Sequence, residues 1–252
     1  MDRPHVPSSP RRQAAIVLIG SVAITLAMFA LPSPQSSLWL LAPFRWLHIY
    51  VHEFGHGMAA VLSGGKFDSF EMYTYSGLAH TRTTGSLAAA FVCAGGLCGP
   101  AVVGGTFLAV GRNVKLARLA LFAFGAFMAL SLVLWTRTPF GWGFGAAVAA
   151  LSLLVAIMAR PALAQMVLVF LGVQLALSVY TGGGYLFTQY VEIQSGYRGP
   201  SDTQAMADAI GGTYWFWGVV CASFSALVLL FGLWQYVRPS RGGRKAALVA
   251  AG

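Results

Sequence analysis

The chain has 252 residues, of which 57% are hydrophobic and only 9% are charged, and its mean hydropathy is +0.70. Soluble domains carry about 25% charged residues, so this composition excludes a soluble globular protein and indicates a multi-pass membrane protein. The net charge of +9 comes from cations that lie mostly at the ends of apolar segments, where they can meet anionic lipid headgroups; without a basic folded face they do not indicate nucleic-acid binding.

Seven apolar segments, most of them close to the roughly 20 residues that a spanning helix needs, predict an all-α integral membrane protein with about six or seven transmembrane helices. The segments are 14–31, 38–62, 86–110, 118–135, 143–158, 162–180 and 213–237. We expect a basic cytoplasmic tail over residues 1–13, one membrane-embedded domain over 14–237 and a basic tail over 238–252. The expected location is the cell membrane, in contact with the lipid bilayer.

The second segment carries the sequence His52-Glu53-Phe54-Gly55-His56. On a helix, His52 and His56 lie one turn apart on one face, where two imidazoles can bind one zinc ion. Glu53 projects near the same face and can take a proton from a water molecule beside the metal. An ionisable side chain at membrane depth costs roughly 2.5–3.5 kcal/mol on insertion scales, and a metal ion would compensate for three of them. The motif therefore predicts an intramembrane zinc site.

Residues 66–84 differ from their apolar neighbours because they are rich in Phe, Tyr and Thr and contain a Ser76-Gly77 turn. This pattern predicts a small β-hairpin directly after the segment with the motif. The edge of such a hairpin can pair with an extended peptide, and we place that edge at residues 67–75. We expect Tyr73, Tyr75 and His80 to contact a substrate; the alternative is a capping loop.

The third segment is interrupted by the sequence AGGLCGP, which ends at Pro100. Gly95 and Gly99 have the small-xxx-small spacing of closely packed helices, whereas Pro100 predicts either a kink or a re-entrant turn. Seven simple crossings place the cations around Arg112 and after Arg238 outside, against the positive-inside rule, and a re-entrant third segment places them inside. The sequence is compatible with both orientations.

A catalytic zinc ion needs a third protein ligand and an open position for water. The candidates are Asp2, His5, His48, Asp68, Glu71, His80, Glu192, Asp202 and Asp208. Asp202 is preferred, because Ser201 and Gln204 form a capping-box pattern that starts a helix with this carboxylate in its first turn. His48 lies one turn before His52, and we expect it to support the site or to lie at the membrane interface.

The stretch HEFGHGMAAVLSGGK, the hairpin ending in SGLAHT, the segment AGGLCGP and the late SDTQAM together resemble the site-2 protease family of intramembrane zinc metallopeptidases, in particular its B-type branch without a PDZ domain. The similarity covers residues from about 45 to 215. It implies that His52, His56 and Asp202 bind zinc and that Glu53 activates water. It also implies that the substrate is a transmembrane protein.

Two departures from that family concern the late aspartate and the oxyanion. Asp202 stands in a Ser-Asp-Thr context rather than before a glycine, as in the B-type branch. Many members carry an asparagine after the Gly-Pro turn, whereas the only asparagine here is Asn113. A different donor, either His80 or the zinc ion, would have to stabilise the oxyanion.

Two other functions are compatible with the motif. A membrane peptidase of the prenyl-protein-processing type also uses HExxH but takes a later glutamate as ligand, which here would be Glu192. A zinc-dependent scaffold would bind other membrane proteins without cutting them. The scaffold is distinguished by a phenotype that needs His52 but tolerates replacement of Glu53.

Overall fold

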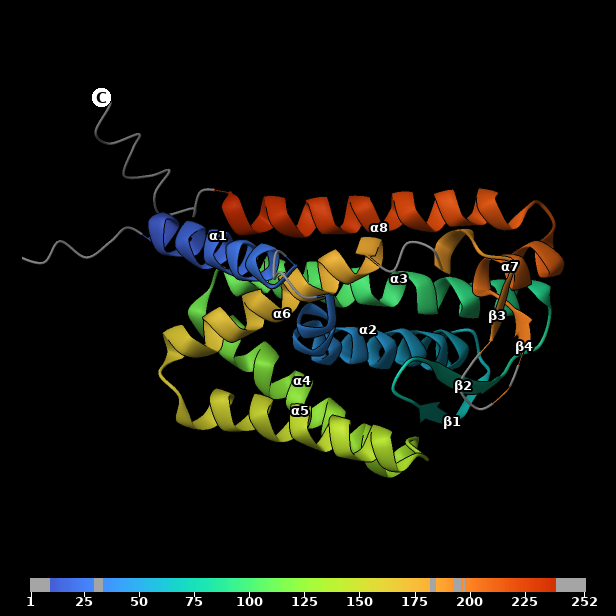
Figure 1. Ribbon diagram of the computed structural model, residues 1–252, viewed down its shortest axis with the longest axis horizontal. Coiled ribbons are helices and arrows are strands. Elements are labelled where there is room, and N and C mark those ends of the chain that lie inside the picture. Colours follow the sequence, from blue (N-terminus) through green and yellow to red (C-terminus); the bar gives the residue numbers. More distant parts are fainter. Residues whose placement is uncertain (1–9, 30–33, 182–184, 193–195, 197, 239–252) are drawn as a thin grey trace, which may run out of the picture.

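The computed structural model describes residues 10–29, 34–181, 185–192, 196 and 198–238, so most of the two expected tails lies outside the described residues. The helices and strands that position the rest of the molecule follow the chain in a simple order (Figure 1). They are α1 (Pro10–Phe29), α2 (Pro34–Leu62), β1 (Lys66–Met72), β2 (Gly77–Arg82), α3 (Ser86–Gly111), α4 (Val114–Leu134), α5 (Pro139–Met158), α6 (Pro161–Thr181), the 3-10 turn η1 (Tyr185–Phe187), β3 (Tyr190–Glu192), β4 (Arg198–Pro200), α7 (Asp202–Ile210) and α8 (Tyr214–Val237).

Within the described residues, five helices are long and apolar enough to cross a membrane, judged by length and composition. They are α3, α4, α5, α6 and α8. The helix with the motif, α2, is 29 residues long but is not one of the five, because Arg45, Glu53 and three histidines lower its hydropathy. The expected helical membrane bundle with a small hairpin after α2 is therefore confirmed.

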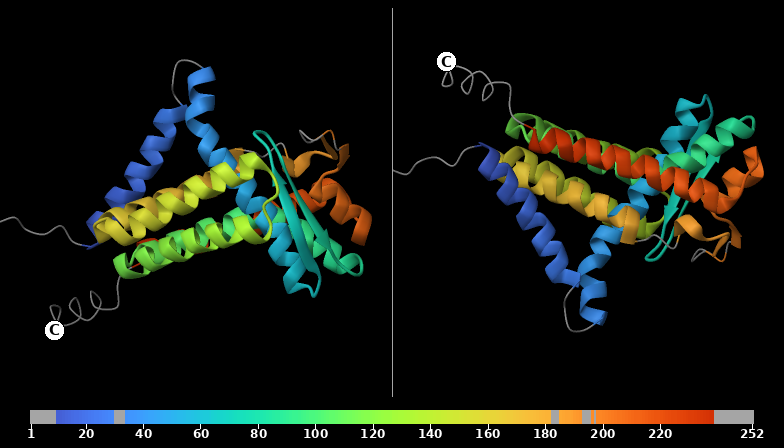
Figure 2. Two further views of the ribbon diagram at one scale, coloured as in Figure 1. Left: turned by 90° about the horizontal axis from the view of Figure 1, so that it is seen from below. Right: turned by 90° about the horizontal axis from the view of Figure 1, so that it is seen from above.

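Helix α3 lies at the centre of the bundle, where it packs against α2, α6, α7 and α8, while α4 and α5 form a neighbouring pair (Figure 1). Helices α1 and α2 meet in a V that projects from one side (Figure 2). The strands lie at one end of the bundle, and the α3–α4 connection, the α5–α6 connection and the end of α8 lie at the other. The basic residues Arg112 and Arg238 consequently share one end.

Helix α3 runs without interruption from Ser86 to Gly111 and includes Pro100, so the third segment forms a spanning helix and not a re-entrant turn. Glycines allow α2 and α3 to cross with their backbones in contact. A β-carbon on Gly95 would lie 2.6 Å from the carbonyl oxygen of Gly55 and 2.5 Å from the β-carbon of Ala59. The close contact predicted from the small residues of α3 is confirmed.

Strands β1 and β2 form the expected antiparallel hairpin, with Met72 opposite Gly77 and a bulge between Phe67 and Ser69. The outer edge of β1 is already paired with the α4–α5 connection. The Phe70 N–H donates to the Trp135 carbonyl at 2.9 Å, and the Arg137 N–H donates to the Phe70 carbonyl at 3.1 Å. The open edge placed at residues 67–75 was therefore wrong, because tertiary contacts fill it.

Strand β2 carries the other edge of the hairpin and, among the described residues, pairs only with β1. Since the Phe70 backbone points away from β2, Phe70 and Ala79 are a non-hydrogen-bonded pair. The N–H and C=O groups of Ala79 therefore point outward, and by alternation those of Gly77 and Thr81 do too. The free backbone groups of the hairpin thus belong to β2.

A second small hairpin, formed by β3 and β4, was not predicted from the sequence; it precedes α7. Helix α7 begins as predicted, with the Ser201 hydroxyl accepting a hydrogen bond from the Gln204 N–H at 3.2 Å. The reciprocal half of the capping box is not formed. The Ser201 N–H donates to the Gln189 carbonyl at 2.8 Å instead, and the Gln204 side chain donates to Asp208 at 2.7 Å.

Candidate metal centre

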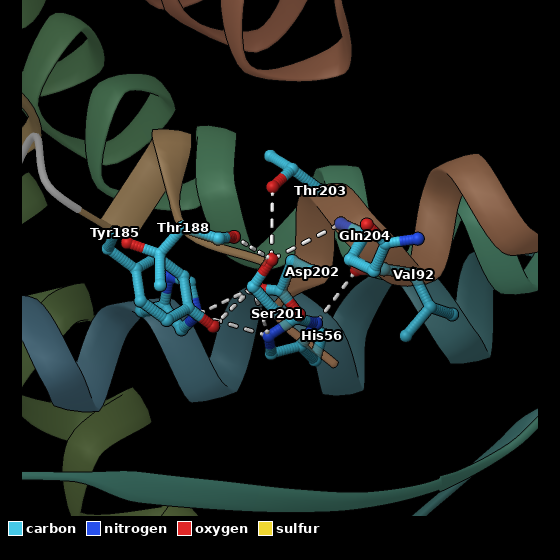
Figure 3. A network of polar contacts seen from close by, with 9 residues as sticks. His56, Val92, Tyr185, Thr188, Ser201, Asp202, Thr203 and Gln204 are labelled. Atoms are coloured by element: carbon cyan, nitrogen blue, oxygen red, sulfur yellow. Dashed lines mark hydrogen bonds and ion pairs between the residues drawn. The ribbon is translucent and has the colours of Figure 1, made fainter. Parts of the chain in front are cut away.

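Three side chains from distant parts of the chain meet between α2 and the start of α7 (Figure 3). The Nε2 atom of His52 lies 3.1 Å from Nε2 of His56 and 3.1 Å from Oδ2 of Asp202. Nε2 of His56 lies 3.3 Å from the same Asp202 oxygen. Among the described residues, this is the only group of three or more His, Cys, Asp or Glu side chains with ligand atoms within 4.8 Å of one another.

The hydrogen-bond partners of His56 indicate what this arrangement binds. Its Nδ1 lies 2.9 Å from the Val92 carbonyl, which can only accept, so Nδ1 carries the hydrogen. In the neutral ring Nε2 then holds a lone pair, and that lone pair faces the carboxylate oxygen of Asp202. Electron-pair donors that face one another are stable only with a cation between them.

The size of this group fits zinc. Tetrahedral ligands about 2.0–2.1 Å from a zinc ion lie about 3.3 Å from one another. The distances of 3.1, 3.1 and 3.3 Å among the three ligand atoms match that spacing. Two imidazoles and one carboxylate also leave a fourth position for water, as in catalytic zinc sites.

His48 lies beside this group without joining it. The Ser178 hydroxyl donates its only hydrogen to the Leu175 carbonyl at 2.7 Å, so it accepts from Nδ1 of His48 at 2.8 Å. The rings of His48 and His52 are 5.9 Å apart. His48 thus has a supporting position, and its remaining lone pair, on Nε2, belongs to a ring that lines the cavity described next.

A cavity of about 610 Å³ extends from the metal centre along β2. One wall is α2 with its two histidines and Glu53, and the opposite walls come from β2, β3, η1 and the start of α7. Glu53 is buried, and the side of β2 with the free backbone groups, at Gly77, Ala79 and Thr81, lines the same cavity. A peptide that paired with β2 would therefore run past Glu53 and the candidate ligands.

Glu53 is held close to the first residue of β2. A β-carbon on Gly77 would lie 2.6 Å from both Cγ and Oε1 of Glu53. The backbone of Ala79 also interacts with this carboxylate. The hairpin thus sets the position of the acidic side chain relative to the histidines, a role that the sequence did not reveal because Gly77 was assigned only to a turn.

The three residues expected to contact substrate occupy different places. Tyr75 lines the cavity, and its ring lies 4.9 Å from the Arg45 guanidinium carbon. The Tyr73 hydroxyl donates to Glu71 at 2.6 Å, and Nε2 of His80 lies 3.5 Å from the same carboxylate. Neither Tyr73 nor His80 lines the cavity, because both are directed to Glu71.

The other candidate ligands lie apart from the two histidines of the motif. Asp68 pairs with Arg82 at 2.5 Å, and Asp208 accepts from the Gln204 side chain. Glu192, the ligand that a prenyl-processing type of enzyme would need, lines the cavity but is not part of the group of ligand atoms. Asp2 and His5 lie outside the described residues.

One further side chain reaches the metal centre without having been predicted. The Tyr185 hydroxyl donates a hydrogen bond to Oδ2 of Asp202 at 2.9 Å (Figure 3). Its ring meets that of His52 edge to face, with centroids 5.4 Å apart. The only sequence signal was its place directly after three glycines, which predicts a loop and not a site residue.

Comparison with known proteins gives one match. A family model described as Peptidase M50B-like matches residues 19–232. No curated protein and no solved structure matches the chain.

Proposed function

Because the chain belongs to the M50B-like peptidase family, we propose that it is a zinc-dependent intramembrane endopeptidase that cuts transmembrane-protein substrates. The resemblance to site-2 proteases is confirmed at the level of the family. The observation that carries the finer proposal is the convergence of His52, His56 and Asp202 beside Glu53 in one cavity.

The proposed chemistry divides the work between a metal ion and Glu53. A zinc ion bound by His52, His56 and Asp202 would polarise the scissile carbonyl and lower the pKa of water. Glu53 would accept a proton from the attacking water and then donate it to the leaving amine, so that no net proton is gained or lost at this carboxylate. Burial of Glu53 against Gly77 holds it in place for both transfers.

The substrate would be bound as an extended strand on the free edge of β2. A peptide bond inside a helix is protected by its own hydrogen bonds, so the substrate must unwind before it can be cut. The outward N–H and C=O groups of Ala79 and Thr81 can replace the lost hydrogen bonds. Tyr75 lines the cavity at the end of β2 where the turn lies, in a position to contact the bound segment.

We place the enzyme in the cell membrane as a multi-pass protein. The five apolar helices support a position within a bilayer, with lipid around the bundle. A transmembrane substrate would then reach the cavity from within the same membrane.

Replacement of Glu53 by glutamine tests this function. The variant should keep the zinc content of the wild type, because Glu53 is not in the ligand group, and it should lose hydrolysis. Membrane stubs that accumulate in cells with the variant, identified by proteomics against cells with the wild-type protein, would be the substrates.

The same variant distinguishes the enzyme from a zinc-dependent scaffold. If Glu53→Gln retains the cellular phenotype while His52→Ala abolishes it, the protein acts by binding and not by hydrolysis. Wild-type cleavage rates in the purified glutamine variant would also overturn the proposal.

A further inference from the structure

Tyr185 is the one tyrosine that touches a proposed zinc ligand. Its hydroxyl lies 2.9 Å from Oδ2 of Asp202 and donates to it, because a carboxylate can only accept. Oδ2 is also the oxygen that faces Nε2 of both His52 and His56. The phenol therefore holds the carboxylate oxygen that completes the metal centre.

The segment that carries Tyr185 is fastened to the start of α7 at two further points. The Ser201 N–H donates to the Gln189 carbonyl at 2.8 Å, and the Ser201 hydroxyl donates to the Thr188 carbonyl at 2.5 Å (Figure 3). On the other side, Gly218 of α8 packs directly against the Leu186 carbonyl, leaving no space for a side chain. The phenol and the carboxylate are thus carried on two segments that are fixed relative to each other.

Asp202 needs such support more than the histidines do. His52 and His56 lie on one helix, where the backbone sets their spacing, and His56 is oriented by the Val92 carbonyl. Asp202 arrives from α7, a helix of nine residues, and is the first of them. Outer hydrogen-bond partners of this kind fix the orientation of metal ligands, and their loss typically costs about 10–100-fold in metal affinity or activity.

We propose that Tyr185 is a positioning residue for the metal centre, which acts by holding the Asp202 carboxylate toward the two histidines. This inference rests on the proposed function, since it takes Asp202 to be a zinc ligand. It assigns to the polar segment before α7 a part in metal binding.

The test compares Tyr185→Phe with the wild-type protein, each purified as the full chain in detergent. Competition with a chelator should show that the variant binds zinc about 10–100-fold more weakly. The cobalt-substituted protein should show a changed visible absorption spectrum, because the carboxylate is no longer held in one orientation. Tyr180→Phe is the matched control: its hydroxyl donates to the Ala222 carbonyl at 3.3 Å, away from the cavity, and zinc affinity should stay unchanged.

A double variant separates positioning from a general effect on folding. In an Asp202→Asn background, Tyr185→Phe should cause no comparable further loss of zinc affinity, because the phenol has no carboxylate to hold. An equal loss in both backgrounds would overturn the inference. So would wild-type zinc affinity in Tyr185→Phe, whatever its cleavage rate.

Failure of this inference is distinguishable from failure of the proposed function. If Asp202→Ala binds zinc as the wild type does, the proposed ligand set is wrong. If Asp202→Ala loses zinc but Tyr185→Phe keeps it, only the role of Tyr185 is wrong.

Discussion

The α-carbon of Gly77 lies so close to Glu53 that a β-carbon there would be 2.6 Å from Oε1 of the carboxylate. The first residue of β2 and the proposed catalytic base are therefore in direct contact. Glycine is needed here for space, and the contact makes the position of the base depend on the hairpin.

Gly77→Ala should consequently slow cleavage while leaving the zinc content unchanged. The added methyl group must displace Glu53, and a shift of about 1 Å at a reacting group can cost roughly 100-fold in rate. Cleavage assays and metal analysis of the same preparation measure both effects. Gly143→Ala, which adds a methyl group where no atom lies within 4 Å, is the control and should cleave normally.

Asp202→Ala should lower zinc occupancy and abolish cleavage, because two histidines alone form a weak site. Asp208→Ala removes a carboxylate from the same helix that is bound only to the Gln204 side chain in the described structure. It should do little to either quantity. Equal zinc contents in the two variants would remove Asp202 from the ligand set.

Thr81→Pro tests the strand-addition proposal. Proline removes an N–H that points away from β1, so the hairpin ladder is preserved while one hydrogen bond to an added strand is lost. Cleavage should fall with zinc content unchanged. Thr81→Val keeps the N–H and should cleave as the wild type does; a loss of the same size in Val would point to the side chain instead.

Gly95→Ala should destabilise the protein although alanine ordinarily favours a helix by roughly 0.5–1 kcal/mol over glycine. The new methyl group would meet the Gly55 carbonyl and Ala59, and such overpacking costs about 1–3 kcal/mol. A lower melting temperature in detergent is expected. Gly143→Ala should not lower it, so a drop common to both would indicate another cause.

Acid should loosen the hairpin through Asp68. The hydrogen-bonded Arg82 guanidinium holds the pKa of Asp68 below its ordinary value of 3.8. A carboxyl whose pKa is lowered by folding stabilises the fold above its ordinary pKa, and this contribution is lost as the pH falls through the folded value. Hydrogen exchange of the hairpin should be faster in Asp68→Asn than in the wild type at neutral pH. The difference should disappear in strong acid.

The sequence predicted the long helices well, because each needs an uninterrupted apolar stretch and few polar residues compete with it. The second segment, for example, was expected at 38–62 and forms a helix over Pro34–Leu62. Pro100 shows the limit: local geometry allowed a re-entrant turn, but packing of α3 against four other helices keeps it helical.

The site was predictable where one residue type has one strong chemical preference. The two histidines of the motif and Asp202 were placed in one centre from their spacing and from the helix start, and the structure brings them together. Tyr185 and Gly77 could not be found in this way, because their roles depend on contacts between segments far apart in the chain. The same holds for the choice between the edges of β1 and β2, which the α4–α5 connection decides.

Pairing of β1 with residues 135–137 leaves the hairpin a single edge on which a strand can add. Successive side chains of an added strand point to opposite faces of the sheet. Every second residue of the bound segment would then meet the same kind of surroundings, and its neighbours would meet different ones. Sequence preferences of this peptidase should therefore alternate along the substrate, with selective positions separated by permissive ones, and not be concentrated in one residue at the cut.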